Sequence, residues 1–343
     1  MPPTVQNAEI TPTADRTQRD RIVAAFSKMY LFVVFAIILV IGAAISPYFL
    51  TARNLVNIIT AASITSVLAV GQFFVIVTGG IDLSVGSLAA LATVVSAILL
   101  ANHQSAAVAS LITLLICGMV GLINGSLVVY AGITPFIATL AMLSIVEGSS
   151  YIIQTGELIQ ISDKGFASFF AGSLGGSIPA PVIIFLVITA IAAFVMNNTT
   201  FGRELYAIGG NREAARLSGL PIDRDLLLAY VTSGLMAGLA GLMLAAQLLE
   251  GSSLIGKGYE LDSIAAVVVG GASLFGGSGD PLRAVIGGLI IATILNIMNL
   301  VGIQSQPQLV IKGLVILIAV FFTSGVGLRR LRRALGARFR RQA

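Results

Sequence analysis

The sequence predicts an all-α integral membrane protein with about ten transmembrane helices, some of them broken or re-entrant. Three observations predict this class: 57% of the 343 residues are hydrophobic, only 10% are charged, and the mean hydropathy is +0.98. About a quarter of the residues in a soluble domain are charged, so this chain lacks the composition of a water-exposed surface. The apolar residues also gather in runs near the roughly 20 residues that a helix needs to cross the hydrocarbon core.

These apolar runs give the expected helices in order along the chain. Their centres lie near residues 37, 66, 91, 118, 143, 189, 238, 267, 292 and 316. The run at 261–272 is short for a full span, so it is predicted to be a half-helix or a re-entrant segment, and the total lies between about nine and eleven. The chain has no Trp, so its seven Tyr residues, each near a predicted span end, are expected to form the interfacial belt.

The chain divides into a membrane domain and two polar tails. The transmembrane domain is expected at residues 29–325, with a disordered cytoplasmic tail at 1–28 and a basic cytoplasmic tail at 326–343. The first span is expected to be retained, because its apolar run is longer than a signal-peptide core. Two longer loops stand out, an outer one at 156–180 and an inner one at 198–224.

The positive charges sort between the two sides of the membrane. With the amino terminus inside, most Lys and Arg residues fall on the inner side, and the outer side receives only Arg53, Lys164, Lys257 and Lys312. This asymmetry follows the positive-inside rule and predicts that both termini are cytoplasmic. The Arg-rich tail is expected to bind anionic membrane lipid. The net charge of +5 therefore reflects topology, and no nucleic-acid partner is expected.

The chain has few candidate catalytic or metal-binding residues. Cys117 and His103 are each the only residue of their type, so neither a disulfide nor a cluster of soft metal ligands is expected. Residues 251–258 come close to a phosphate-binding loop, but Gly258 stands where a Ser or Thr must hold Mg²⁺, and no strand precedes the segment. The sequence predicts no catalytic site, no metal site and no cofactor in this chain.

One segment places a carboxylate between two long apolar runs. Residues 77–86 read Val-Thr-Gly-Gly-Ile-Asp-Leu-Ser-Val-Gly. An ionisable group at membrane depth is kept when it faces a cavity, a partner or the bundle interior, and the glycines let the backbone break and pack closely. Residues 269–280 form a similar Gly-rich stretch, and paired breaks in two halves point to a transport site. Gly-rich turns between helices also look alike by chance.

The inner loop at 198–224 carries the signals of one short helix. Asn211 is a good N-cap, Glu213 in the first turn suits the helix dipole, and Gly219 supplies the left-handed stop before Pro221. A helix of about two turns is marginal alone in water. It is therefore expected to dock on a partner, or to rest as a connector on the inner face of its own protein.

These segments together resemble the permease subunits of ribose-type ABC importers, a binding-protein-dependent class of the carbohydrate-uptake systems. The resemblance rests on residues 78–86, 201–219, 270–274 and 311–313, and it covers most of residues 30–325. The spacing of Glu213-Ala214-Ala215, three residues and Gly219 is similar to the motif by which importer permeases engage their ATPase.

The resemblance implies an ATP-driven importer of a monosaccharide in the bacterial inner membrane. It implies a second permease copy, identical or different, an ABC ATPase that binds ATP and Mg²⁺ in the cytoplasm, and a periplasmic or lipid-anchored sugar-binding protein. The short inner helix would then be the coupling helix. The residues expected to engage the ATPase are Arg203, Asn211, Arg212, Glu213, Ala214, Ala215, Arg216 and Gly219.

A second set of residues is expected to line or gate the substrate pathway, because sugar hydroxyls need amide and carboxylate partners. The set is Gln72, Gly79, Gly80, Asp82, Ser84, Gly86, Asn124, Asn296 and Asn299. The plain alternative for the amides is hydrogen bonding between helices. Asp82 either binds sugar or caps the next helix with Ser84 nearby, and its place near the cytoplasmic end of its span favours capping or gating.

A proton-coupled secondary transporter of a small polar solute is the main alternative. Glu147, the other acid in an apolar span, would be its proton relay. The absence of a His or Lys partner in the neighbouring spans argues against this alternative, as does the coupling-helix pattern of the inner loop. A passive channel is disfavoured because no charged or carbonyl filter motif is evident.

Overall fold

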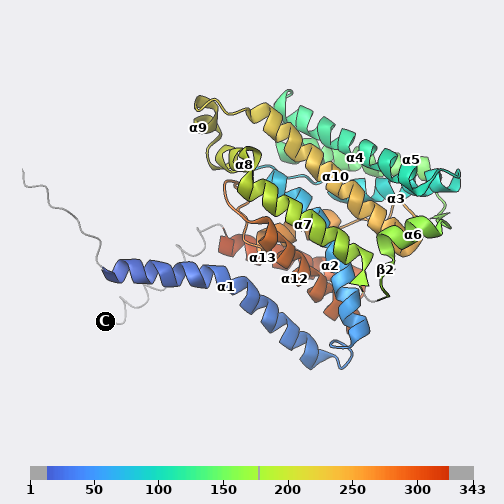
Figure 1. Ribbon diagram of the computed structural model, residues 1–343, viewed down its shortest axis with the longest axis horizontal. Coiled ribbons are helices and arrows are strands. Elements are labelled where there is room, and N and C mark those ends of the chain that lie inside the picture. The colour runs from blue at the N-terminus through green and yellow to red at the C-terminus, as the bar shows by residue number, and fades with distance from the viewer. Residues whose placement is uncertain (1–13, 177, 324–343) are drawn as a thin grey trace, which may run out of the picture.

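The computed structural model describes residues 14–176 and 178–323, and it is almost entirely helical (Figure 1). Each of the ten expected apolar runs forms a helix. Their bounds are α1 Ala14–Ile45, α2 Ala52–Ile76, α3 Val85–Ala101, α4 Ala106–Val129, α5 Pro135–Gln154, α7 Ala180–Asn198, α10 Ile222–Leu248, α11 Tyr259–Val269, α12 Pro281–Leu300 and α13 Ser305–Thr323.

The lengths of these helices separate full spans from half-helices. Among the described residues, six helices are long and apolar enough to cross a membrane: α2, α4, α5, α7, α10 and α12. The apolar parts of α1, α3 and α13 are shorter, and α11 has 11 residues. The expected half-helix near residue 267 is therefore present as α11.

The two longer loops form small elements at opposite ends of the bundle (Figure 1). One end carries α6 Lys164–Ala171 with two short antiparallel pairs. These pairs join β1 Ile159–Gln160 to β4 Glu250–Gly251, and β2 Ser173–Leu174 to β3 Ile178–Pro179. The other end carries α8 Thr200–Gly210 and α9 Arg212–Leu217.

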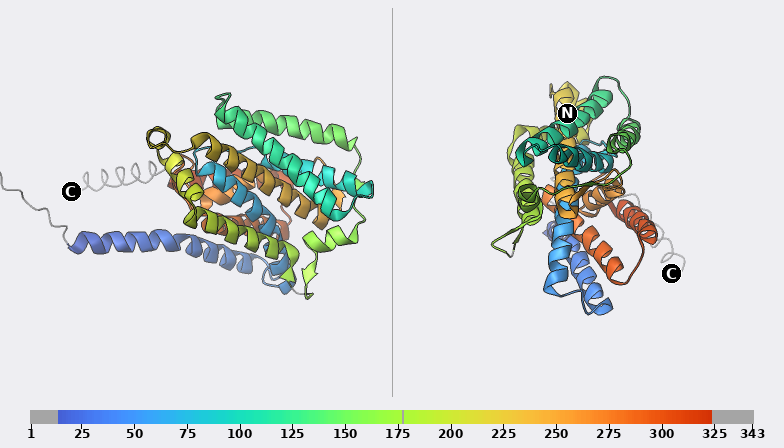
Figure 2. Two further views of the ribbon diagram at one scale, coloured as in Figure 1. Left: turned by 45° about the horizontal axis from the view of Figure 1, so that its top comes forward. Right: turned by 90° about the vertical axis from the view of Figure 1, so that its right-hand side faces the viewer.

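The amino-terminal segment differs from the expected disordered tail. Helix α1 already begins at Ala14, because residues 14–28 contain neither Gly nor Pro and continue into the apolar span without a break. In Figure 2, α1 lies along one side of the bundle, and the hydroxyl of Tyr30 donates to the carbonyl of Val269 (3.2 Å). Residues 1–13 and the expected basic tail at 326–343 lie outside the described residues.

Helices α2 and α10 form the centre of the bundle. In the most apolar 18-residue stretch of each helix, 83% of the α2 residues and 61% of the α10 residues are buried. The same share is 28% in α4, α5 and α7. The outer helices thus present apolar side chains to the hydrocarbon. Small residues allow α4 and α10 to approach closely: Gly121 lies against the carbonyl of Tyr230, and Gly234 against the carbonyl of Cys117.

The bundle consists of two four-helix units of opposite orientation, α2–α5 and α10–α13. Helix α4 packs on α10 as α12 packs on α2, and α3 packs on α5 as α11 packs on α13. The carbonyl of Val77, the residue after α2, accepts from the amide of Gly277 (2.8 Å) and lies against Gly209 of α8, which with α9 leads into α10. The two central helices therefore run in opposite directions, and the break after α2 corresponds to the break after α10.

This arrangement corrects the repeat expected from the sequence. Segments 77–86 and 269–280 are not equivalent positions in two units, because they lie at the same end of the bundle and contact one another. Their shared glycines reflect this close approach, since Gly79 and Gly276 both have positive φ and the backbone of each lies against the other segment. The segment equivalent to 77–84 is 249–258.

Candidate functional site

Two broken helices meet inside the bundle. The chain leaves helical structure after α2 and after α10, and α3 and α11 then begin within the protein at residues 85 and 259. Gly86, in the first turn of α3, lies against the carbonyl of Gly256 and the side chain of Glu260. The amino-terminal ends of the two half-helices are therefore neighbours, an arrangement that transport proteins use at substrate sites near the membrane midplane.

Side chains from neighbouring helices satisfy the backbone of both breaks. In the orientation that satisfies its amide, Gln72 donates to the carbonyl of Asp82 (3.0 Å) and accepts from its amide (3.2 Å). In the other break, the hydroxyl of Thr93 accepts from the amide of Ser252 and donates to its carbonyl (3.1 Å each). Non-helical backbone in a membrane protein needs such partners because lipid offers none.

Asp82 is the centre of a buried polar cluster. Its Oδ1 accepts from the amide (3.0 Å) and the hydroxyl (2.6 Å) of Ser84, and its Oδ2 accepts from the hydroxyl of Ser233 (2.8 Å). The amide of Asn124 donates to the hydroxyl of Ser84 (2.9 Å). These side chains are fully buried, with an exposed fraction of 0% each. The cluster ties the first break to α4 and α10 and leaves Asp82 no exposed surface.

The structure brings only some of the expected pathway residues together. Gln72, Ser84 and Asn124 meet at Asp82, whereas Asn296 exchanges two hydrogen bonds with Asn54 (3.0 and 2.8 Å) at the far end of α2. Gly79 and Gly80 belong to the same break, and Gly86 lies where the half-helices meet. The side-chain oxygen of Asn299, Oδ1, accepts from the side-chain amide of Gln308 (2.7 Å). Transport roles for these residues stay predictions.

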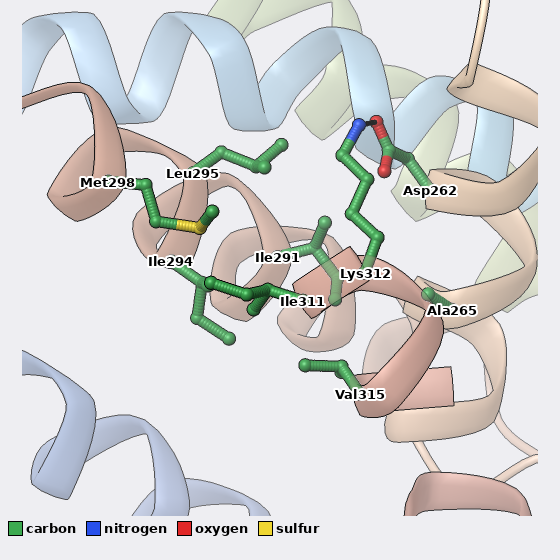
Figure 3. A pocket seen from close by; sticks show the side chains of 9 residues that line it. All are labelled: Asp262, Ala265, Ile291, Ile294, Leu295, Met298, Ile311, Lys312 and Val315. Atoms are coloured by element: carbon green, nitrogen blue, oxygen red, sulfur yellow. Dashed lines mark hydrogen bonds and ion pairs between the residues drawn. The ribbon is translucent and has the colours of Figure 1, made fainter. Parts of the chain in front are cut away.

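Two ion pairs lie beside the half-helices. Lys312, expected on the outer side, lies inside the bundle with its Nζ 2.7 Å from Oδ2 of Asp262, in an otherwise apolar pocket (Figure 3). Lys257 pairs with Glu147 (2.7 Å). The sequence expectation concerned only partners in the neighbouring spans, and Lys257 lies instead in the break after α10, so Glu147 has a Lys partner that this expectation did not cover. The lining of the pocket is Asp262, Ala265, Ile291, Ile294, Leu295, Met298, Ile311, Lys312 and Val315.

Sequence reasoning missed several residues of this region. Ser233 and Asp262 belong to no motif that the sequence singles out, and both side chains are buried in the structure. The signal for Ser233 was its position three residues after Tyr230 on the buried face of α10. In the part of the chain that the structure describes, no three His, Cys, Asp or Glu side chains come close enough to hold a metal ion.

The expected short inner helix is present as α9. Oδ1 of Asn211 caps it by accepting from the amide of Ala214 (3.0 Å), and Gly219 follows with φ +75°. Ala215 is buried with Ile208 of α8 and with Ile222 and Leu226 of α10. The remaining expected coupling residues are exposed: Arg203, Asn211, Arg212, Glu213, Ala214, Arg216 and Gly219. The helix therefore rests on one small apolar contact and turns most of its surface outward.

Helix α8, which the sequence analysis did not anticipate, connects α9 to the first break. Gly209 lies against the carbonyl of Val77, the last residue before the Gly-rich segment. The hydroxyl of Tyr206 donates to the carbonyl of Gly279 (2.9 Å), and burial raises the pKa of Tyr206 to about 12, so this donor stays protonated at neutral pH. Residues 198–224, the first break and residues 270–280 are therefore in contact with one another.

These features define the class of protein. A multi-pass helical bundle with two facing half-helices and an exposed helix at one end has the architecture of a membrane transport protein. Residues 54–320 match the family model described as "Branched-chain amino acid transport system / permease component". The chain belongs to this family of permeases, which are transport components and not catalytic enzymes.

The relatives are of similar length and cover most of the chain. The D-allose transport system permease protein of Escherichia coli K12 is 39% identical over 86% of this chain and 91% of the relative. The ribose import permease of the same strain is 38% identical over 83% and 89%, and the L-arabinose permease is 38% identical over 85% and 89%. The comparison with solved structures found no match.

Proposed function

We propose that the chain is the membrane-spanning subunit of an ATP-driven importer for a monosaccharide. The supporting observation is the similarity, over more than four-fifths of the chain, to permeases named for ribose, allose and arabinose. The family model is named for branched-chain amino acids, so sugar specificity is the part of the proposal that needs a direct test. Bond chemistry takes place elsewhere, because ATP and Mg²⁺ bind to a separate ATPase chain.

The α9 surface is proposed as the docking site of that ATPase. Its exposed side chains combine two arginines, Arg212 and Arg216, and Glu213 with Leu217, which is 82% exposed. An exposed apolar residue ringed by charges is typical of a protein contact, in which charges orient docking more than they strengthen it. Movement of α9 would pass through α8 to Val77 and the first break, since these elements are in contact. ATP-driven closure would thereby shift the two units between two packings.

The proposed orientation places α8, α9 and both termini in the cytoplasm. The distribution of Lys and Arg supports it, because Arg203, Arg212 and Arg216 lie at the α9 end while α6 lies at the other. A second permease copy completes the pathway, and a sugar-binding protein docks near α6. Epitope tags inserted at Gly175 and Gly219 test this: in intact spheroplasts an antibody should reach the first tag only. Access to the second tag instead would reverse the orientation.

Uptake measurements test the proposed function. Vesicles from cells that make the chain with its ATPase and binding protein should accumulate labelled D-ribose, D-allose or L-arabinose only when ATP reaches the α9 side. Labelled leucine is the comparison substrate, because the family model is named for branched-chain amino acid transport. Accumulation of leucine without any sugar would overturn the sugar assignment. Uptake driven by a proton gradient, with no ATPase chain present, would favour the secondary transporter and overturn the importer.

A pair of variants tests the docking surface. Leu217→Asp places a charge in the proposed contact, so it should abolish copurification of the ATPase while leaving the permease folded. Phe169→Asp is the control, because Phe169 is 68% exposed on α6 at the opposite end. Loss of the ATPase in both variants, or in neither, would contradict docking at α9.

A further inference from the structure

An exposed ion pair lies within the transmembrane part of the bundle. Glu147 belongs to α5, seven residues before its last residue, which is about 10 Å along the helix axis. Its carboxylate lies 2.7 Å from Nζ of Lys257, and 40% of the Glu147 side chain and 60% of the Lys257 side chain are exposed. Charges at this depth are costly when they face hydrocarbon. This surface therefore faces water or another protein chain.

A second ion pair beside a half-helix is buried and offers a comparison. Lys312 belongs to α13, and its partner Asp262 belongs to the half-helix α11, which packs on α13. That pair is largely buried: the exposed fraction is 15% for the Lys312 side chain and 4% for the Asp262 side chain. Apolar side chains surround it (Figure 3). A pair that only held a half-helix against its neighbour would need no more exposure than this.

The exposed pair opens into a small polar cavity at the junction of the half-helices. The cavity lining is Gly86, Ser87, Ala90, Leu143, Glu147, Ser253, Lys257 and Glu260. Both oxygens of the Glu260 carboxylate share one donor, the amide of Gly258 (3.2 and 3.1 Å), so this carboxylate keeps further acceptor capacity. The polar groups that line the cavity are one ammonium, two carboxylates and serine hydroxyls, and the Glu147–Lys257 pair is the exposed part of this set.

We propose that Glu147 and Lys257 form a contact site for the transported molecule, at the junction of α3 and α11. The site suits a neutral polyhydroxyl compound, because the ammonium of Lys257 offers donors and the carboxylate of Glu147 offers acceptors, while the pair carries no net charge. A sugar hydroxyl both donates and accepts, so it can replace each half of the ion pair in turn. This inference rests on the proposed import of a sugar and names the part of the surface that the sugar touches.

Cysteine accessibility tests whether water reaches the Glu147–Lys257 surface. The chain has one cysteine, Cys117, which is buried, so a Cys117→Ala background leaves a single reporter. In the complete transporter, Lys257→Cys and Glu147→Cys should react with a membrane-impermeant thiol reagent, and saturating sugar should slow that reaction. Ile145→Cys on the same helix, 59% exposed, is the control for a lipid-facing position. Reporters as inert as the control would overturn the proposal.

Transport kinetics separate sugar contact from a structural role. Glu147→Gln and Lys257→Gln should raise the KM of uptake about tenfold, the size expected of one lost charge-assisted hydrogen bond. The ratio of KM values for D-ribose and 2-deoxy-D-ribose should move toward one in at least one variant. A structural pair would instead lower uptake of both sugars equally with their ratio unchanged. If the wild type takes up sugar and both variants have wild-type KM values, the proposed contact site is wrong but the proposed function stands. If the wild type takes up no sugar, the proposed function itself is wrong.

Discussion

At the scale of single residues, burial separates polar side chains that hold the backbone from those that can meet a ligand. Asp82 is fully buried and accepts three hydrogen bonds from Ser84 and Ser233. Two of these bonds come from Ser84, the residue immediately before α3, so Asp82 holds the backbone that leads into that helix. Glu147 and Lys257 have the opposite character, because much of each side chain is exposed.

Substitution of Asp82 should therefore affect folding before it affects specificity. Asp82→Ala leaves Ser84 and Ser233 without their buried acceptor and should cost at least about 3 kcal/mol, seen as a lower melting temperature of the purified protein in detergent. Asp82→Asn keeps one acceptor oxygen and should fall between Asp82→Ala and the wild type. Asp223→Asn is the control, because Asp223 is exposed. Normal melting with altered sugar preference would instead indicate contact with substrate.

At the scale of elements, the contact of α8 with the first break depends on the absence of one side chain. A Cβ on Gly209 would collide with the carbonyl of Val77, whereas a Cβ on Gly210 would meet nothing within 4 Å. The two adjacent glycines thus have different roles. Gly209 allows the close approach, and Gly210 is simply the last residue of α8.

This difference gives a matched pair of substitutions. Gly209→Ala should separate α8 from Val77 and reduce ATP-dependent uptake at least about tenfold, since the contact that links α9 to the break is lost. Gly210→Ala should leave uptake unchanged and stabilise the helix by up to about 1 kcal/mol. Equal uptake by both variants in vesicles with matched permease content would show that the α8 contact does not transmit movement.

The sequence predicted the helices better than their interruptions. Apolar runs identify all ten membrane helices, and Asn211, Gly219 and Pro221 identify α9, because these signals are local. The repeat was misassigned because Gly-rich composition reports close backbone approach, not position in a unit. Helix α8 was missed because Gly202, Gly209 and Gly210 weaken a pattern whose buried face is Leu205 and Ile208. The Lys312–Asp262 pair joins residues 50 positions apart, which no local pattern reveals.

At the scale of the whole molecule, the two ion pairs beside the half-helices lie in different surroundings, one exposed and one buried. In the second unit, α11 is short and its pair with α13 is buried, so Lys312 and Asp262 depend on each other. Removing one partner of a buried ion pair leaves the other charge without compensation, which is more harmful than removing both.

Three variants test this dependence. Lys312→Met should destabilise the permease by about 3–5 kcal/mol, whereas the double variant Asp262→Leu/Lys312→Met should recover much of the loss, because the pocket is otherwise apolar. Lys164→Met, an exposed lysine on α6, is the control. The measurement is melting in detergent for each variant. A double variant as unstable as Lys312→Met would show that charge pairing is not what holds α11.

The hydrogen bonds that Gln72 and Thr93 make to the two breaks have a consequence for comparing transporters. These side chains stand in for the helical neighbours that Asp82 and Ser252 lack. Their presence follows from the interrupted path of the chain and carries no information about the cargo. Permeases that share this path should retain such residues even when they carry chemically different molecules, so a count of interior amides and hydroxyls is a poor guide to what a permease transports.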